Sequence, residues 1–334
     1  MKTDRRTGAC LNCNEQLDEE YKYCPNCGQR NSDNNVSVGT LLGDVFSNYF
    51  SLDSKFIKSF VPFFFKPGVL TSRFVEGKRV RFVQPVRLYV LTSLMFFFVM
   101  KSVLTRNDLN FSDVFSDNNQ EELLAEPSLI AMDFGEDDAI SPTQNDTATA
   151  FLEQEFSNDL YSLIRNPSIS NAAVLDSLGV SVNGPWGMSL VTQVRKILNK
   201  DVNVFIAFLL GNIPIMMVFV VPVLALVLKL LYIRRKKLYI THLVHAIHLH
   251  AFAYLTYGLV FLMLYFSTKA LDDSGYFALI ALALVGVYSL VSFFTVYRQG
   301  VLKTIVKFLI VGFMYSFFML LFLLGESFLS ILYF

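Results

Sequence analysis

Residues 66–103 have the sequence KPGVLTSRFVEGKRVRFVQPVRLYVLTSLMFFFVMKSV, in which a basic segment interrupted by proline and glycine leads directly into an apolar run from Leu88 to Met100. Lysine and arginine side chains that flank the first apolar span of a membrane protein stay on the cytoplasmic side. The junction between the two segments therefore predicts a first transmembrane helix that enters the membrane from the cytoplasm. It also sets the direction of every later span.

The composition of the chain is that of an integral membrane protein. Of its 334 residues, 53% are hydrophobic, and the mean hydropathy is +0.45. Soluble globular proteins have a smaller apolar share, roughly 45–50%. The formal net charge is zero, but basic residues lie at the edges of apolar runs, and acidic residues concentrate between Asp108 and Asp159. This separation of charge argues against a protein that binds nucleic acid.

Five segments are long and apolar enough to cross a bilayer as helices, which takes about 20 residues each. They are Val86–Leu104, Val202–Tyr232, Leu243–Phe266, Tyr276–Tyr297 and Thr304–Leu324. The second of these segments contains Pro214 and Pro222, so we expect it to be kinked.

The charges of the loops between the spans agree with a single orientation. Residues 234–237, Arg298 and Lys303 are basic and are expected inside, whereas the loops at 106–201 and 267–275 are acidic and are expected outside. The first residues of the chain contain no apolar run like that of a signal peptide. We therefore expect a multi-pass protein of the cytoplasmic membrane, with its N-terminus in the cytoplasm and its C-terminus outside.

All four cysteines lie near the N-terminus in two pairs with the spacing CxxC, namely Cys10, Cys13, Cys24 and Cys27. Two such pairs supply four thiolates to one tetrahedral zinc ion, because the two-residue spacer lets both sulfurs of a pair face the metal. Disulfides would need an oxidising compartment, and a redox pair would need a βαβ context. We expect a structural zinc ribbon with no open coordination position. Its role is either to bind a cytosolic protein or only to stabilise this end of the chain.

Two amphipathic segments precede the first span. Apolar residues recur at helical spacing between Val38 and Phe50 and again from Phe56 to Phe64, with Lys55 and Lys58 beside the second group. Both segments are too short to cross the membrane. They are expected either to lie in the headgroup plane or to pack on the transmembrane bundle of the protein itself. The sequence leaves this choice open.

Between these segments and the first span lie Lys78, Arg79, Arg81 and Arg87, which we call the basic collar. Prolines and glycines divide this stretch into short pieces, so the cations are expected at the membrane surface. There they would attract the phosphates of anionic lipids, at about 1 kcal/mol for each basic residue. The alternative is that these cations only determine membrane topology.

The stretch containing Pro67-Gly68, Gly77-Lys78-Arg79 and Pro85-Val86-Arg87-Leu88-Tyr89 resembles the signature of DUF3667, a family of uncharacterised bacterial membrane proteins. The resemblance covers the cysteine pairs, this stretch and, more weakly, the histidine segment. It implies an architecture in which an N-terminal zinc ribbon precedes a hydrophobic region. It implies no reaction, because the family has no assigned activity.

The four histidines lie together at the start of the third span, at positions 242, 245, 248 and 250. On a helix, His242, His245 and His248 occupy one sector of about 120°, and His250 lies on the other flank. Three imidazoles one turn apart are suited to a second metal site or to proton transfer. The alternative is that they face headgroups or bond to neighbouring helices. In the family that this segment resembles, an acidic residue often precedes the first histidine, whereas here Thr241 does.

The predicted fold class is a mainly α membrane protein with about five transmembrane helices, a small N-terminal zinc ribbon and interfacial amphipathic helices. We prefer a role in interaction, assembly or sensing, with zinc as a structural cofactor and with anionic lipids and a cytosolic protein as partners. The alternative is a membrane-embedded metal-dependent enzyme or transporter that uses the histidines. The expected parts are the ribbon at 1–35, the amphipathic helices and basic collar at 36–85, the first span at 86–104, an acidic loop or cap at 105–201 and four further spans at 202–334.

Overall fold

A computed structural model describes most of the chain outside the acidic loop. The described residues are 6–18, 20–32, 38–39, 55–106, 163–164, 166, 168–177, 185–200, 202–266 and 274–333. Their secondary structure is helical, apart from isolated β-bridges in the cysteine-containing segment. The predicted acidic stretch between Asp108 and Asp159 and the helix predicted from Val38 to Phe50 fall almost entirely outside the described residues.

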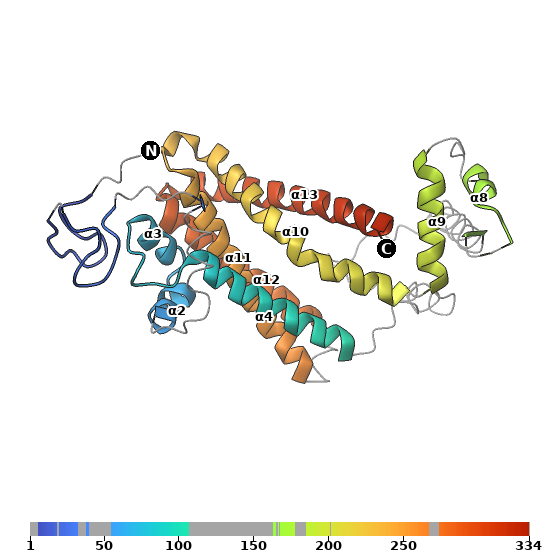
Figure 1. The fold of residues 1–334 in the computed structure, drawn as a ribbon, viewed down its shortest axis with the longest axis horizontal. Helices are drawn as coiled ribbons and strands as arrows, with labels where there is room; N and C mark the ends of the chain where they lie inside the picture. The colour runs from blue at the N-terminus through green and yellow to red at the C-terminus, as the bar shows by residue number, and fades with distance from the viewer. Residues whose placement is uncertain are drawn as a thin grey trace, which may run out of the picture. The chain divides into compact units, whose positions relative to one another are not determined.

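Ten helical elements are described (Figure 1). They are α2 (Lys55–Phe65), α3 (Val69–Val75), α4 (Pro85–Arg106), α8 (Asn171–Ser177), α9 (Pro185–Lys200), α10 (Val202–Leu231), the 3-10 turn η2 (Ile233–Arg235), α11 (Tyr239–Phe266), α12 (Ser274–Tyr297) and α13 (Val301–Tyr333). Five of them, α4 and α10 to α13, are long and apolar enough to cross a membrane. The predicted fold class is therefore confirmed.

Two of these five helices extend beyond a predicted end by four residues or more. Helix α11 begins at Tyr239 instead of Leu243, so all four histidines lie inside it. Helix α13 continues to Tyr333, and at 1.5 Å per residue its 33 residues are about 50 Å long. This exceeds the hydrocarbon thickness of about 30 Å, because the apolar residues after Leu324 continue the helix.

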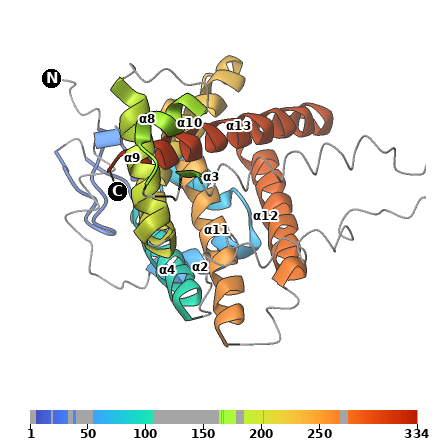
Figure 2. The same cartoon turned by 90° about the vertical axis from the view of Figure 1, so that its right-hand side faces the viewer.

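The chain divides into two compact units, and each is described by itself. The first unit contains residues 1–108 and 214–322, and the second contains residues 109–213 and 323–334. In the first unit, α11 packs against α4 on one side and α12 on the other (Figure 2). The contact with α4 is close at Gly258, where a Cβ atom would lie 3.7 Å from Cα of Phe96.

The N-terminal half of α11 is buried on nearly all sides. From Thr241 to His248 every residue is buried, as expected for a helix enclosed by its neighbours. The surrounding core combines residues of α10, α11, α12 and α13 with Tyr232, which follows α10. Its largest buried side chains include Tyr232, Tyr297 and Phe293, and the rings of Tyr232 and Tyr297 are stacked with centroids 3.7 Å apart.

Helix α2 packs on the bundle along one face and exposes the other. Phe63 is buried 6.0 Å from the ring of Phe252, and its carbonyl accepts a 2.6 Å hydrogen bond from the hydroxyl of Tyr288. Phe60 and Phe65 remain 56% and 74% exposed. Packing on the bundle, one of the two expected arrangements, is therefore observed for the buried face of this helix.

Gly68 brings the short helix α3 into direct contact with α12. It precedes α3 with a φ of 78°, a left-handed conformation that glycine adopts without steric cost. A Cβ atom at this position would lie 2.8 Å from the carbonyl oxygen of Ser292 and 2.9 Å from Cβ of Thr295. The glycine of the Pro67-Gly68 pair is thus explained by a close backbone approach between two segments far apart in the sequence.

The described part of the second unit includes a small helical pair. Val174 and Leu175 of α8 are buried together with Val191 of α9. The guanidinium of Arg195 on α9 donates hydrogen bonds to the carbonyl of Ile169 at 2.6 Å and to Oδ1 of Asn171 at 2.7 Å. A short helix is thus held against α9 by both apolar and polar contacts.

Candidate functional site

The two cysteine pairs are built in the same way, 14 residues apart. The backbone N–H of Cys10 donates to the carbonyl of Glu15 at 2.8 Å, and that of Cys24 donates to the carbonyl of Gln29 at the same distance. Asn14 and Gly28 both have a left-handed φ, of 64° and 71°. In each turn this conformation bends the chain back after the second cysteine.

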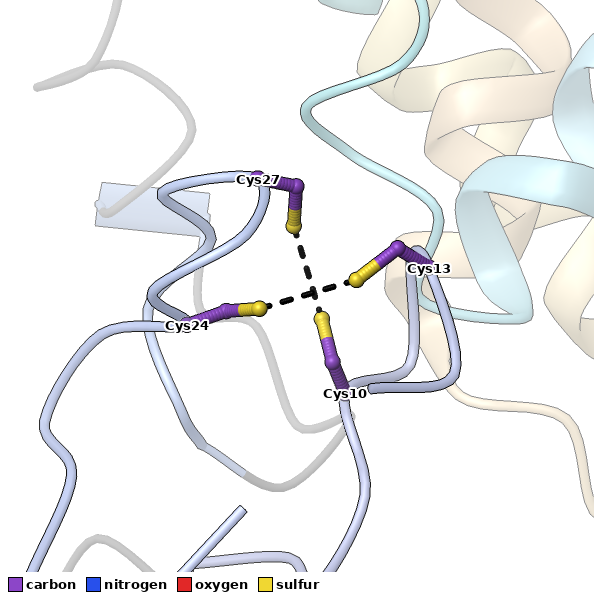
Figure 3. A group of neighbouring side chains, drawn as sticks. All are labelled: Cys10, Cys13, Cys24 and Cys27. Atoms are coloured by element: carbon purple, nitrogen blue, oxygen red, sulfur yellow. Dashed lines mark hydrogen bonds between the residues drawn. The ribbon is translucent and has the colours of Figure 1, made fainter. Parts of the chain in front are cut away.

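The four sulfurs converge on one point (Figure 3). Cys10 and Cys27 have sulfurs 3.5 Å apart, as do Cys13 and Cys24, and all four sulfurs lie within 4.8 Å of one another. A tetrahedral zinc site with Zn–S bonds of about 2.3 Å has sulfurs about 3.8 Å apart, so these residues fit a metal ion. A disulfide needs a sulfur–sulfur bond of about 2.05 Å, and all four thiols are free.

The environment of the thiols differs among the four positions. Burial raises the pKa of Cys10. Burial also acts to raise the pKa of Cys27, but hydrogen bonds from the backbone of Gln29, from Asn12 and from other cysteines lower it to about 7. Metals bind the thiolate and not the thiol. With a pKa of about 7, Cys27 is partly ionised near neutral pH and can act as a ligand there.

Gln29 connects the cysteine module to the segment that bears the basic collar. It is buried, and its side-chain amide donates a 2.8 Å hydrogen bond to the carbonyl of Gly77. The same side chain accepts a 3.3 Å hydrogen bond from the backbone N–H of Arg79. Since the carbonyl of Gln29 is bonded to Cys24, one residue contacts both the metal ligands and the basic collar.

The collar residues do not gather in a single pocket. Arg79 lies over the ring of Phe74 at 5.6 Å, Arg81 over Phe82 at 5.8 Å and Arg87 over Phe56 at 5.5 Å. The ammonium group of Lys78 lies 3.4 Å from the carboxylate of Glu76. Each cation is thus placed beside its own apolar or acidic neighbour, and together they follow the chain from just after α3 to the first turn of α4.

The histidines of α11 are buried, and each of them has a hydrogen-bond partner on a neighbouring helix. Nδ1 of His242 and Nδ1 of His245 lie 2.9 and 3.3 Å from the hydroxyl of Tyr297. Nε2 of His245 lies 2.9 Å from the hydroxyl of Ser292. Nδ1 of His248 lies 2.8 Å from the hydroxyl of Thr71 on α3. These contacts match the expectation that the histidines bond to neighbouring helices.

His250 points to another side of α11. Its Nδ1 lies 2.8 Å from the carbonyl of Ala246 and its Nε2 lies 3.2 Å from the hydroxyl of Tyr315 on α13. Among the described residues, the four cysteines are the one group of three or more potential ligands whose donor atoms come within 4.8 Å of one another. The histidines are held by hydroxyl partners instead.

Several residues of these sites have no signal in the sequence. Ser292 and Tyr297 occupy ordinary positions in an apolar span, and Gln29 is a polar residue after the second CxxC pair. Their part in these sites is seen only from the residues to which they bond in the structure. Thr71 lies inside the signature stretch, but it is 177 positions away from its partner His248. No periodicity relates positions so far apart.

Comparison with known families finds a match to one part of the chain. Residues 53–97 match the family model described as "Protein of unknown function (DUF3667)". The matched stretch covers α2, α3, the basic collar and the first half of α4, and it supports the resemblance seen in the sequence. No curated protein and no solved structure matches the chain.

Proposed function

We propose that the chain is an integral membrane protein with an interaction, assembly or sensing role, in which a structural zinc ribbon supports a basic collar that binds anionic lipid. It would lie in the cytoplasmic (inner) membrane of a bacterium, with the ribbon in the cytoplasm and the C-terminus outside. The observation that carries this proposal is the contact of Gln29 with Gly77 and Arg79.

The Gln29 contact supports a mechanical link between the metal and the collar. Zinc binding orders the turn that follows Cys24 and Cys27, because the coordination bonds supply folding free energy that so small a module lacks. The backbone of Gln29 belongs to that turn, while its side chain bonds to the carbonyl of Gly77, which directly precedes the collar, and to the backbone N–H of Arg79 within it. Loss of the metal would therefore release the collar segment as well as the ribbon.

The surroundings of the collar suit a membrane surface. Arg81 is exposed, and the exposed face of α2 carries Phe60 and Phe65 beside Lys58. Aromatic side chains next to cations are typical of segments that lie at the boundary between headgroups and acyl chains. At about 1 kcal/mol for each basic residue near the surface, four cations would contribute about 4 kcal/mol to the binding of anionic lipid.

The ribbon also offers a surface for a cytosolic protein. Tyr21 and Tyr23 lie between the two cysteine pairs and are 45% and 61% exposed. Tyrosine is enriched in protein interfaces, because it combines a large apolar ring with a hydrogen-bonding hydroxyl. We assign the predicted protein partner to this surface.

The lipid part of the proposal is tested by comparing Arg81→Gln with Lys22→Gln, which removes an exposed cation from the ribbon instead. Full-length protein is purified from membranes, and retained phosphatidylglycerol and phosphatidylcholine are counted by native mass spectrometry. Arg81→Gln is expected to weaken phosphatidylglycerol binding about fivefold, the equivalent of 1 kcal/mol, whereas Lys22→Gln leaves it unchanged. Equal effects of the two variants, or equal retention of both lipids by the unmodified protein, contradict the proposal.

The link between metal and collar has its own test. Gln29→Ala removes the hydrogen bonds to Gly77 and Arg79 and leaves the four cysteines in place. Amide hydrogen exchange of residues 77–81 is expected to become faster in this variant, and also in the unmodified protein after removal of the metal with a chelator. If the chelator unfolds the ribbon without changing exchange at residues 77–81, the ribbon does not support the collar.

A further inference from the structure

A pocket of about 350 Å³ opens at the end of the first unit where α11 begins. Its wall includes Ser72 and Glu76 from the end of α3, Arg235 and Lys237 from the connection between α10 and α11, Thr241 from the first turn of α11, and Arg298 from the end of α12. The volume falls in the range of small-molecule sites, roughly 300–1,000 Å³. Two chain segments far apart in sequence thus contribute cations to one cavity.

The positive charge in this pocket is not neutralised by the described part of the chain. Arg235, Lys237 and Arg298 have no carboxylate within ion-pair distance among the described residues. Glu76, the acidic residue of the wall, lies 3.2 Å from Arg73 and 3.4 Å from Lys78. The three cations therefore repel one another without a described carboxylate between them, and a bound anion would reduce this repulsion.

The loops that carry these cations are held in place. The guanidinium of Arg235 donates a 3.4 Å hydrogen bond to the carbonyl of Arg298, and the ammonium group of Lys229 donates to the carbonyl of Lys237. Lys236 and Arg298 have φ values of 51° and 49°, in the left-handed region that few side chains adopt. Residues held in such conformations are concentrated at functional sites.

The pocket also contains neutral donors suited to an anion. The hydroxyls of Ser72 and Thr241 make no side-chain hydrogen bond to any other described residue. Thr241 lies in the first turn of α11, where the helix dipole favours negative charge, although its own backbone N–H is bonded to the carbonyl of Leu238 at 3.0 Å. Burial, together with the charges of Arg298 and Arg235, lowers the pKa of Lys237, as expected for a lysine that faces other cations without a counter-ion.

We propose that this pocket binds a phosphate group through Arg235, Lys237 and Arg298, with Ser72 and Thr241 as neutral donors. The phosphate belongs either to a lipid headgroup or to a water-soluble phosphorylated compound. Both present a phosphate anion to the same three cations. The site is separate from the basic collar, since none of the collar residues lines it. It therefore does not depend on the function proposed above. In the orientation proposed there, the pocket opens to the cytoplasm.

The proposal is tested by measuring how anions protect Lys237 from acetylation. Full-length protein in phosphatidylcholine nanodiscs is treated with a water-soluble acetylating reagent, and the modified lysines are quantified by peptide mass spectrometry. Parallel samples contain inorganic phosphate, glycerol 3-phosphate or phosphatidic acid in the nanodisc, with chloride at matched ionic strength as the reference. Lys236, the exposed neighbour that does not line the pocket, is the internal control.

The result expected is a several-fold fall in acetylation of Lys237 relative to Lys236. Protection by inorganic phosphate and glycerol 3-phosphate identifies a soluble ligand, and protection by phosphatidic acid alone identifies a lipid headgroup. Arg235→Gln and Arg298→Gln are each expected to raise the half-protecting concentration about tenfold, as for one lost charge-assisted contact. Arg234→Gln removes an adjacent exposed cation that does not line the pocket and is expected to change nothing.

Three results would overturn the proposal. They are no protection by any of the three phosphates, equal protection of Lys236 and Lys237, and an effect of Arg234→Gln as large as that of Arg235→Gln. Each would mean that these cations act only as diffuse positive charge. The comparison of the two lysines is made in the unmodified protein, so it does not depend on the folding of a variant.

Discussion

Replacement of Gly68 by alanine tests the contact that anchors α3 to the bundle. Gly68 has a φ of 78°, and an added Cβ atom would lie 2.8 Å from the carbonyl oxygen of Ser292 and 3.0 Å from its hydroxyl. The first distance is shorter than a carbon–oxygen contact allows and the second is tight, and the nearer atom belongs to the backbone of α12, which cannot rotate away. The hydroxyl that would be displaced is the partner of His245.

The expected loss of stability has two parts. A left-handed conformation costs an alanine about 1–2 kcal/mol relative to glycine. Overpacking of a close contact costs a further 1–3 kcal/mol, roughly, because α3 and α12 must move apart. Together, Gly68→Ala should lower the free energy of unfolding by about 2–5 kcal/mol. Asparagine tolerates the left-handed region but has a larger side chain, so Gly68→Asn should avoid the backbone cost and retain a steric cost of at least about 1–3 kcal/mol.

The measurement is unfolding of the purified protein in detergent, combined with amide hydrogen exchange of residues 69–75. Gly286→Ala is the matched control, because Gly286 lies on α12 and a Cβ atom there would have nothing within 4 Å. In a helix interior this change should stabilise by about 0.5–1 kcal/mol. Exchange in α3 should become faster in Gly68→Ala and stay unchanged in Gly286→Ala. Equal stability of the two variants would refute the close approach of α3 and α12.

Three further predictions concern the metal, the histidines and the membrane orientation. Cys24→Ser should lose the bound zinc, measured by elemental analysis of purified full-length protein, while the spans still insert; unchanged zinc content would reject the site. His245→Ala should leave the buried hydroxyl of Ser292 without its partner and lower stability by about 1–3 kcal/mol, with metal content unchanged; a fall in metal content would instead support the histidine metal site. A membrane-impermeant protease added to intact cells should cut near Glu136 and spare the cysteine pairs; the reverse pattern would contradict the proposed orientation.

Much of the fold follows from local properties of the sequence. The five spanning helices could be located because twenty consecutive apolar residues identify a span without reference to any other part of the chain. The cysteine site could be located because four thiols with CxxC spacing specify tetrahedral coordination. The start of α11 was placed four residues too late, since Tyr239–His242 is polar enough to resemble a loop. It is helical because α10, α12 and α13 enclose that end of α11.

The role of the histidines could not be decided from the sequence. Their spacing is equally compatible with a metal site, proton transfer or packing, because helical periodicity specifies only the face on which a side chain lies. The structure supplies the partners, which are Tyr297 and Ser292 on α12, Tyr315 on α13 and Thr71 on α3. Likewise, the cations at 235, 237 and 298 have the expected signature of cytoplasmic loops, and only folding brings them to one pocket.

The sequence by itself therefore determined the mainly helical fold class, the five helices apolar enough to cross a membrane and the cysteines that could hold a metal ion, and it predicts an orientation. Hydropathy, charge and short spacings are properties of neighbouring residues. The tertiary structure decided which distant residues meet. Thr71 and His248 are 177 positions apart, Phe63 and Tyr288 are 225 apart, and Gln29 and Gly77 are 48 apart. Such pairs depend on how whole helices pack against one another, and packing is a property of the folded chain that no local pattern contains.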